Sequence, residues 1–386
     1  MSAAHKDDQV IDLGSEKYSN YHSAILLASA SIVAFAGAAA AEITFSGAAE
    51  LGYNDEVNAA AGADDNDGFY SDLNLDVAFA ADLDNGISVS VAADIDEIDG
   101  GYSAAATTLT ISSETATLVY GDTQFAAKSM WVAAGDMEKD GFSDQDGETV
   151  LKGTFSFGGV DMAVSGVASD ADGDLATDDL AQLSFGAKAA LGAATVVVAY
   201  QEETTAADYA AGTAGTANVD YNAGEVFGIS VATSVAGADV TVAYAETTAA
   251  GASDNSTGIK VAYPMGDVTV TAYYVDESNG DANTGLAFAY SAGAASVTLD
   301  LQDDQGTSKT ALDGSYDLGN GLTVYAGVYV EENTDNEYYV AAGYDLGGGA
   351  SLLVSYADAG AAGNADDEVG AGDYQLGTTV ELSFAF

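Results

Sequence analysis

The side chains that could support chemistry in this chain are mostly carboxylates. Among 386 residues, Asp and Glu number 61 and the basic residues number 8, which gives a formal net charge of −53. All the basic residues are Lys, Cys is absent, and the two histidines, His5 and His22, lie near the N-terminus. Thiolate metal sites need Cys, and a Ser-His-Asp triad needs His. The body of the chain therefore lacks the residues of the usual covalent catalysts.

Composition argues against two further classes of protein. Binding to nucleic acid requires clustered positive charge, and this chain has the opposite sign. A disordered acidic tail is also disfavoured, because hydrophobic residues make up 48% of the chain and Tyr alone numbers 22.

Short acidic runs are the candidates that remain for a metal site. Oxygen-rich segments suit a hard cation such as calcium. None is an EF-hand, because position six of a loop that starts at Asp170 is Leu175, where that motif has Gly. A solvated loop of repelling charges explains these runs equally well, and no other cofactor is expected. The calcium candidates are Asp144, Asp146, Asp170, Asp172 and Asp174, with a further acidic run at 64–67.

The N-terminal region differs from the remainder. Residues 24–41 read AILLASASIVAFAGAAAA, an apolar stretch that ends in small residues directly before Glu42. This pattern predicts a secretory signal peptide cleaved after Ala41. A transmembrane helix is the alternative, but the stretch is near the lower length limit and its second half is mostly Ala and Gly. Upstream acids depart from the usual basic start, which is explained either by translation that begins after Met1 or by a mis-assigned extension at residues 1 to about 20. We therefore expect a signal region at 1–41 and a mature domain at 42–386.

Period-two alternation runs through the mature domain. In the last segment, Leu376, Val380 and Phe384 share one face, whereas Thr379 and Glu381 share the other. Successive side chains of a strand point to opposite faces, so each such segment predicts a strand with one apolar and one polar face.

Tight glycine-containing turns punctuate the strands. Glycine supplies the positive φ that short hairpin turns require. Nine such turns imply twenty strands once the two terminal strands are counted. The turns lie at 83–86, near Glu114, and at 157–159, 191–193, 236–238, 264–267, 292–294, 318–321 and 346–349.

The distribution of turns and loops indicates a class of all-β architecture. The hexapeptide that starts at Tyr316 recurs in similar form at Tyr344, each just before a short turn. Longer polar stretches separate the hairpins, for example at 54–68 and 359–372. Short turns on one side, long loops on the other and an aromatic girdle are typical of a transmembrane antiparallel β-barrel of the outer membrane. A soluble β-sandwich or β-solenoid is the alternative, but the number of strands in one series and their spacing disfavour both.

Three stretches resemble the general bacterial porins, specifically their alphaproteobacterial branch. They are the junction Ala41-Glu42-Ile43-Thr44-Phe45-Ser46-Gly47, the segment 343–351 and the terminal strand that ends in Phe386. The resemblance implies a 16-stranded barrel in a homotrimer, which differs from the count of twenty. It also implies a Gram-negative outer membrane, contact with its lipid and lipopolysaccharide, and a barrel-assembly signal at Phe386 read by the assembly machinery.

The resemblance further implies that the third long loop folds into the barrel and narrows it. The longest loop here opens at Gly121 and runs to about Glu148, which matches in length and order. A solvated loop is the alternative, although such a loop has little use for Met130 and Trp131. The expected constriction residues are Asp122, Lys128, Trp131, Asp136, Glu138, Lys139, Asp140, Asp144, Asp146 and Glu148.

Strand parity predicts which charged side chains line the lumen, because the membrane face must be apolar. Five of the acids fall on consecutive strands if the last strand closes on the first, which would make one acidic wall. The lysines fall on other sectors, and the Arg-rich basic wall of the family is absent. The expected lumenal residues are Glu50, Asp72, Asp76, Asp94, Lys152, Lys188, Lys260, Asp300, Lys309 and Glu381.

These features predict passive diffusion of small hydrophilic solutes through a cation-selective pore. The alternative is an acidic barrel with a structural, adhesive or calcium-binding surface role, and conductance would separate the two. An enzymatic barrel is disfavoured because the mature domain has no His to act as a base.

Overall fold

The computed structural model describes residues 30–31, 42–55, 68–83, 86–98, 101–144, 149–169, 181–204, 224–358 and 374–386. Within these ranges the chain is almost entirely β-structure, with one short helix. The first half contains β1 (Ala30–Ser31), β2 (Glu42–Asn54), β3 (Gly68–Asp82), β4 (Ser88–Ile98), β5 (Gly101–Ser112), β6 (Ala116–Gly121), α1 (Ala126–Met130), β7 (Thr149–Phe157), β8 (Val160–Ser169), β9 (Ala181–Leu191) and β10 (Ala194–Gln201). The second half contains β11 (Glu225–Val235), β12 (Ala238–Ala249), β13 (Ala252–Met265), β14 (Val268–Glu277), β15 (Asn283–Ala292), β16 (Ala295–Asp304), β17 (Thr307–Gly319), β18 (Leu322–Glu331), β19 (Glu337–Gly347), β20 (Ala350–Asp358) and β21 (Gly377–Ala385).

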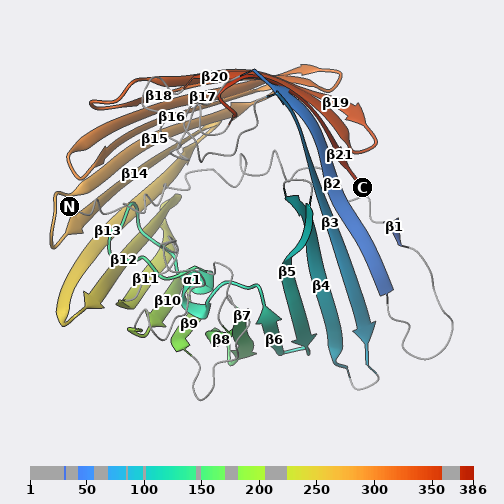
Figure 1. The fold of residues 1–386 in the computed structure, drawn as a ribbon. Helices are drawn as coiled ribbons and strands as arrows, with labels where there is room; N and C mark the ends of the chain where they lie inside the picture. Colours follow the sequence, from blue (N-terminus) through green and yellow to red (C-terminus); the bar gives the residue numbers. More distant parts are fainter. Residues whose placement is uncertain are drawn as a thin grey trace.

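The strands close into a barrel (Figure 1). Every strand from β2 to β20 pairs antiparallel with its successor, and β21 pairs back onto β2 with Val380 opposite Tyr53. Closure leaves no open sheet edge along the ring, as a spanning sheet in lipid requires. The barrel has 20 strands, so the turn count is confirmed and the sixteen strands implied by the resemblance are wrong for this chain.

A short extra strand lies outside this ring. β1 pairs with β2 where Ala30 lies opposite Phe45, on the part of β2 that extends past the end of β21. No helix in the described part of the chain is both long and apolar enough to cross a membrane.

The predicted hairpin turns all fall at one end of the barrel, between consecutive strands. The β7–β8 and β17–β18 turns illustrate the chemistry, because Gly158, Gly159, Asn320 and Gly321 all have positive φ. Such two-residue turns match the right-handed twist of the flanking strands. We call this rim the short-turn end.

The connections at the opposite end vary more than the sequence suggested. β10 and β11 are separated by 202–224, and β20 and β21 by 359–376. In contrast, β12–β13 and β16–β17 are joined by two-residue turns whose first residues, Ala250 and Gln305, adopt positive φ. We call this rim the loop end.

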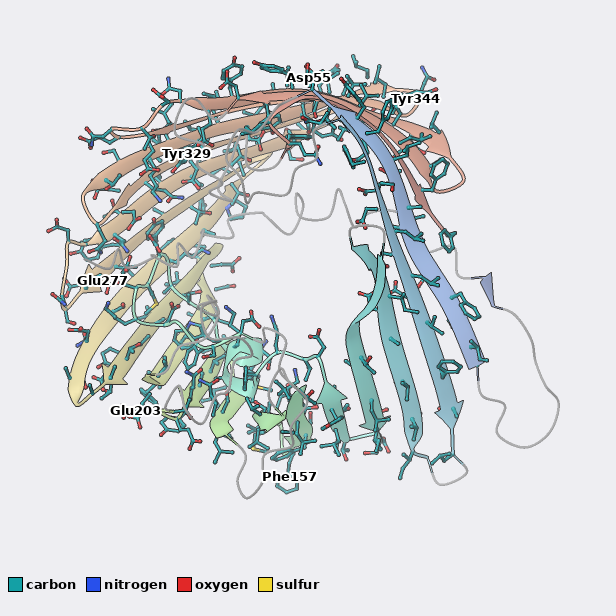
Figure 2. The ribbon with its side chains drawn as sticks, viewed as in Figure 1. Asp55, Phe157, Glu203, Glu277, Tyr329 and Tyr344 are labelled. Carbon is teal, nitrogen blue, oxygen red and sulfur yellow. The ribbon has the colours of Figure 1, made fainter. Side chains whose placement is uncertain are left out.

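The two faces of the barrel wall differ in chemistry. On β11, Phe227, Ile229 and Val231 point outward and are exposed, whereas Val226 and Ser230 point inward and are buried. Phe157 lies at the outer rim of the short-turn end (Figure 2). An outward belt at the same end contains Tyr263, Tyr290, Tyr316 and Tyr344, which are 40–50% exposed. This is the predicted position of the aromatic girdle.

Candidate functional site

The segment between β6 and β7 turns inward rather than away from the barrel. At its start, the N–H of Asp122 donates to the carbonyl of Thr107 over 3.1 Å. Gly121 has φ of +128°, and a Cβ there would lie 1.9 Å from that same carbonyl oxygen. Only glycine allows the chain to turn this tightly against β5. The segment then enters the barrel, where α1 lies over β8, β9 and β10 (Figure 1). We call residues 122–144 the internal loop.

Serines of the barrel wall hold the start of the internal loop. The first amides of a helix have no partner within the helix. Here the N–H of Ala126 donates to Ser165 Oγ on β8, and the N–H of Ala127 donates to Ser184 Oγ on β9, each over 2.8 Å. The neighbouring Phe125 is fully buried in an apolar cluster of the inner wall. The wall therefore caps α1 and fixes its position.

Trp131 is the central anchor of the internal loop. Its ring packs against two apolar clusters of the inner wall and lies 5.5 Å from the ring of Phe142. Its Nε1 donates to Asp140 Oδ2 over 2.8 Å. Burial raises the pKa of Asp140 to about 7, although the Trp131 hydrogen bond and the charge of Lys128 act in the opposite direction. A nearby carboxylate, Glu277, adds to the increase.

The far part of the internal loop binds the next sector of the wall. The N–H of Glu138 donates to Glu277 Oε1 over 3.1 Å, and the N–H of Lys139 donates to Ser256 Oγ over 3.0 Å. The N–H of Ser143 returns to β10, where it donates to Gln201 Oε1 over 2.7 Å. The internal loop thus lies along the inner wall from β8 to β15, because Asn283 on β15 also donates to the carbonyl of Asp136.

The predicted constriction residues occupy different positions on this loop. Asp136 and Asp140 are buried against the wall, so they do not face the open lumen. Lys128 pairs with Asp144 at 3.5 Å, and both side chains are half-buried. Asp122 lies at the entry, Glu138 and Lys139 are half-buried, and Trp131 is the anchor described above. Asp146 and Glu148 lie outside the described residues.

Most calcium candidates also lie outside the described residues, namely Asp146, Asp170, Asp172, Asp174 and the run at 64–67. Asp144 is described, and its carboxylate pairs with a lysine. Among the described residues, no group of three or more His, Cys, Asp or Glu side chains is placed to hold a metal ion.

An acidic surface covers the inner wall across β21, β2, β3 and β4. Glu50 on β2 lies directly opposite Asp72 on β3, and Asp76 on β3 lies directly opposite Asp94 on β4. On the neighbouring strand β21, Glu381 accepts a hydrogen bond of 2.7 Å from Tyr70. Like charges directly opposite each other destabilise a sheet, so this arrangement costs stability. We call this surface the acidic wall, made of Glu50, Asp72, Asp76, Asp94 and Glu381.

The four strand lysines point inward from other sectors. Lys152 shares the inner face of β7 with Val150, which is buried under the internal loop. Lys188 lies opposite Asp161, and Lys260 lies opposite Tyr273. Lys309 pairs with Asp304 at 3.4 Å, and both side chains are buried.

Asp300, the remaining predicted lumenal acid, lies on β16 opposite the buried Ala311 of β17. The structure therefore gathers five of the predicted acids on neighbouring strands and leaves the lysines dispersed.

Sequence reasoning missed the wall residues that hold the internal loop. These are inward-facing polar side chains and glycines on β8 to β15. Some inward-facing residues of these strands are valines, such as Val197 and Val226, although a water-filled lumen would favour polar residues there. A second internal contact was also missed, in which the ring of Tyr374 lies 4.6 Å from that of the inward-facing Tyr339. An available signal was the presence of small and apolar residues on the inner faces of these strands, such as Ala199, Val226 and Ala245. The loop-holding residues are Ser165, Ser184, Gly186, Gln201, Gly228, Ser256, Gly258, Glu277 and Asn283.

Comparison with known proteins gives one family. Residues 28–364 match the sequence profile of the family described as Gram-negative porin. No curated protein sequence matches the chain.

Solved porin structures are also similar to this chain, though weakly. One is a variant of Rh. blastica porin with 16% identity, which covers 89% of this chain and 100% of its own, with a TM-score of 0.41. A second variant of that porin has 17% identity, the same coverage and a TM-score of 0.40. A triple mutant of Rhodopseudomonas blastica porin gives 16% identity, the same coverage and a TM-score of 0.39.

Proposed function

Because the chain belongs to the Gram-negative porin family and is a protein of the outer membrane, we propose that it forms a water-filled general diffusion channel. The observation that carries this proposal is the position of the internal loop. The loop lies along β8 to β15 on one side of the lumen, where its described hydrogen bonds to the wall are made, and the acidic wall lies on strands β21 and β2 to β4. Small hydrophilic solutes would pass between them, and no covalent chemistry is implied.

We further propose that the channel prefers cations. The acidic wall carries five carboxylates, and the described inner face offers few lysines to balance them. Rings or walls of Asp and Glu attract cations and repel anions at close range. The effect should weaken in concentrated salt, because the screening length falls to about 3 Å at 1 M ionic strength.

The test is single-channel recording of the refolded mature protein in a planar bilayer, with reversal potentials in a salt gradient. We expect stepwise openings and a reversal potential of the sign for cation preference. Asp76→Asn combined with Asp94→Asn should reduce that preference. The matched control is Asp276→Asn combined with Asp303→Asn, which removes two charges from outward-facing positions of β14 and β16 and should leave selectivity unchanged. An anion-selective pore would refute the selectivity proposal.

A folded, heat-modifiable barrel without conductance would favour the second function, an acidic surface barrel with a structural or adhesive role. Four further proposals, on the oligomer, calcium, lipopolysaccharide and the assembly signal, do not depend on whether the channel conducts. A homotrimer would give conductance in triplet steps, and calcium binding by the acidic loops would show as uptake in equilibrium dialysis. Contact with lipopolysaccharide and recognition of Phe386 by the assembly machinery likewise remain proposals.

A further inference from the structure

The internal loop lies closer to the barrel wall than side chains normally permit. Three inward-facing glycines, Gly186 on β9, Gly228 on β11 and Gly258 on β13, lie directly beneath it. A Cβ on Gly186 would lie 2.6 Å from the backbone oxygen of Ala126, and a Cβ on Gly258 would lie 2.2 Å from that of Ala134. Ordinary van der Waals contacts of a Cβ begin at 3.4 Å. At both points the wall thus approaches the backbone of the loop itself.

The middle glycine receives the anchor side chain. A Cβ on Gly228 would lie 2.5 Å from the ring of Trp131. This ring cannot easily move aside, because it packs on two apolar clusters and its Nε1 is bonded to Asp140. The three contacts involve two backbone segments and one fixed ring, so none can be relieved by rotating a flexible side chain.

The three glycines belong to one continuous row of small residues. Gly186 lies opposite Ala199, which lies opposite Gly228 on the next strand. Gly228 lies opposite Ala245, and the next inward residue of β12, Ala243, lies opposite Gly258. These residues form a shallow track across β9 to β13, and the internal loop occupies it from Ala126 to Ala134.

We infer that Gly186, Gly228 and Gly258 are positioning residues that set the width of the channel by allowing the internal loop to lie flat against the wall. This inference rests on the proposed channel function. A Cβ at any of the three positions displaces the loop by about 1 Å, the shortfall from ordinary contact. The wall is held by its strand pairing on both sides, so the loop moves, and the only free direction is toward the lumen.

The chain offers a direct reporter of loop position, because Trp131 is its only tryptophan. The variants are Gly186→Ala, Gly228→Ala, Gly258→Ala and the triple variant. We expect each to lower single-channel conductance and to reduce the largest sugar that enters proteoliposomes in swelling assays. The triple variant should show the largest loss. Emission from Trp131 should shift to longer wavelength, and its quenching by acrylamide should increase.

The matched control is Gly343→Ala. Gly343 also faces inward from a strand, but its Cβ would meet only an ordinary contact of 3.5 Å with Tyr325, outside the internal loop. This variant should keep wild-type conductance and emission. Heat-modifiable migration on gels verifies that every barrel has folded.

The outcomes distinguish a failure of the proposed channel function from a failure of the positioning role of the three glycines. A folded wild-type barrel that does not conduct would refute the proposed channel function. A conducting wild type with unchanged conductance and Trp131 emission in the three folded variants would overturn the positioning role. Higher conductance in the variants would also overturn it, because the loop would then have left the lumen rather than narrowed it. For a variant that fails to fold, the two remaining single variants give the same readouts.

Discussion

Protonation of Asp140 should control how firmly the internal loop is held. Its carboxylate is buried between the loop and the wall, with one oxygen bonded to Trp131 and the other without a hydrogen-bond partner among the described residues. The charged groups that act on it are Lys128 on the loop and Glu277 on β14. Burial raises the pKa of Asp140 from 3.8 to about 7 in the docked loop.

The sign and size of the effect follow from this shift. The docked state prefers the protonated acid, so docking is strongest below the pKa of the released loop, near 4. Docking weakens as the pH rises to about 7, and it stays constant above that value. A shift of about three pH units, at about 1.4 kcal/mol each, corresponds to about 4 kcal/mol of docking free energy.

The assay is Trp131 emission and acrylamide quenching between pH 4 and pH 9. We expect quenching to rise toward neutral pH. Asp140→Asn should remove this dependence and keep the loop docked at pH 8, because the amide oxygen can still accept from the indole. Asp144→Asn, which removes a half-buried carboxylate of the same loop, should retain the wild-type profile. A flat profile in the wild type, or the same profile in Asp140→Asn, would refute the reasoning.

Three further predictions concern the barrel and its maturation. Gly52→Ala places a Cβ 2.0 Å from the ring of Tyr70 and displaces it from Glu381, so we expect a loss of about 1–3 kcal/mol in unfolding free energy. Denaturant titration measures this loss, and Gly153→Ala, whose Cβ would meet only an ordinary contact of 3.9 Å with Val164, should cost less. Lys309→Met removes the lysine that pairs with the buried carboxylate of Asp304 and should cost about 3–5 kcal/mol; an unchanged unfolding midpoint would contradict a stabilising pair. Cleavage after Ala41 predicts Glu42 as the first residue of the mature protein, and N-terminal sequencing that begins elsewhere would contradict it.

The strand and turn pattern was largely readable from the sequence. The terminal strand β21 alternates without interruption, and turns such as Asn320-Gly321 carry their own conformational signal. These are local properties, decided by neighbouring residues and by the two environments of a barrel wall. Because alternate residues of a strand face opposite sides, the sequence also placed Glu50, Asp72 and Lys309 on the inner face.

The resemblance to a family did not give the correct number of strands. Short matching stretches implied sixteen strands, whereas counting the turns in this chain gave twenty. A turn is a local property of the chain's own residues, so the turns record every hairpin, whereas short matching stretches do not.

The docking of the internal loop was decided by tertiary structure alone. The sequence identified the length of the loop and its tryptophan, but it could not show that Asp136 and Asp140 are buried against the wall. The bond from Glu138 to Glu277 joins residues 139 positions apart. Inward valines such as Val226 depart from a polar lumen, and the internal loop covers them. Periodicity determines the face to which a side chain points, whereas the surface that faces it depends on closure of the barrel and on contacts between distant strands.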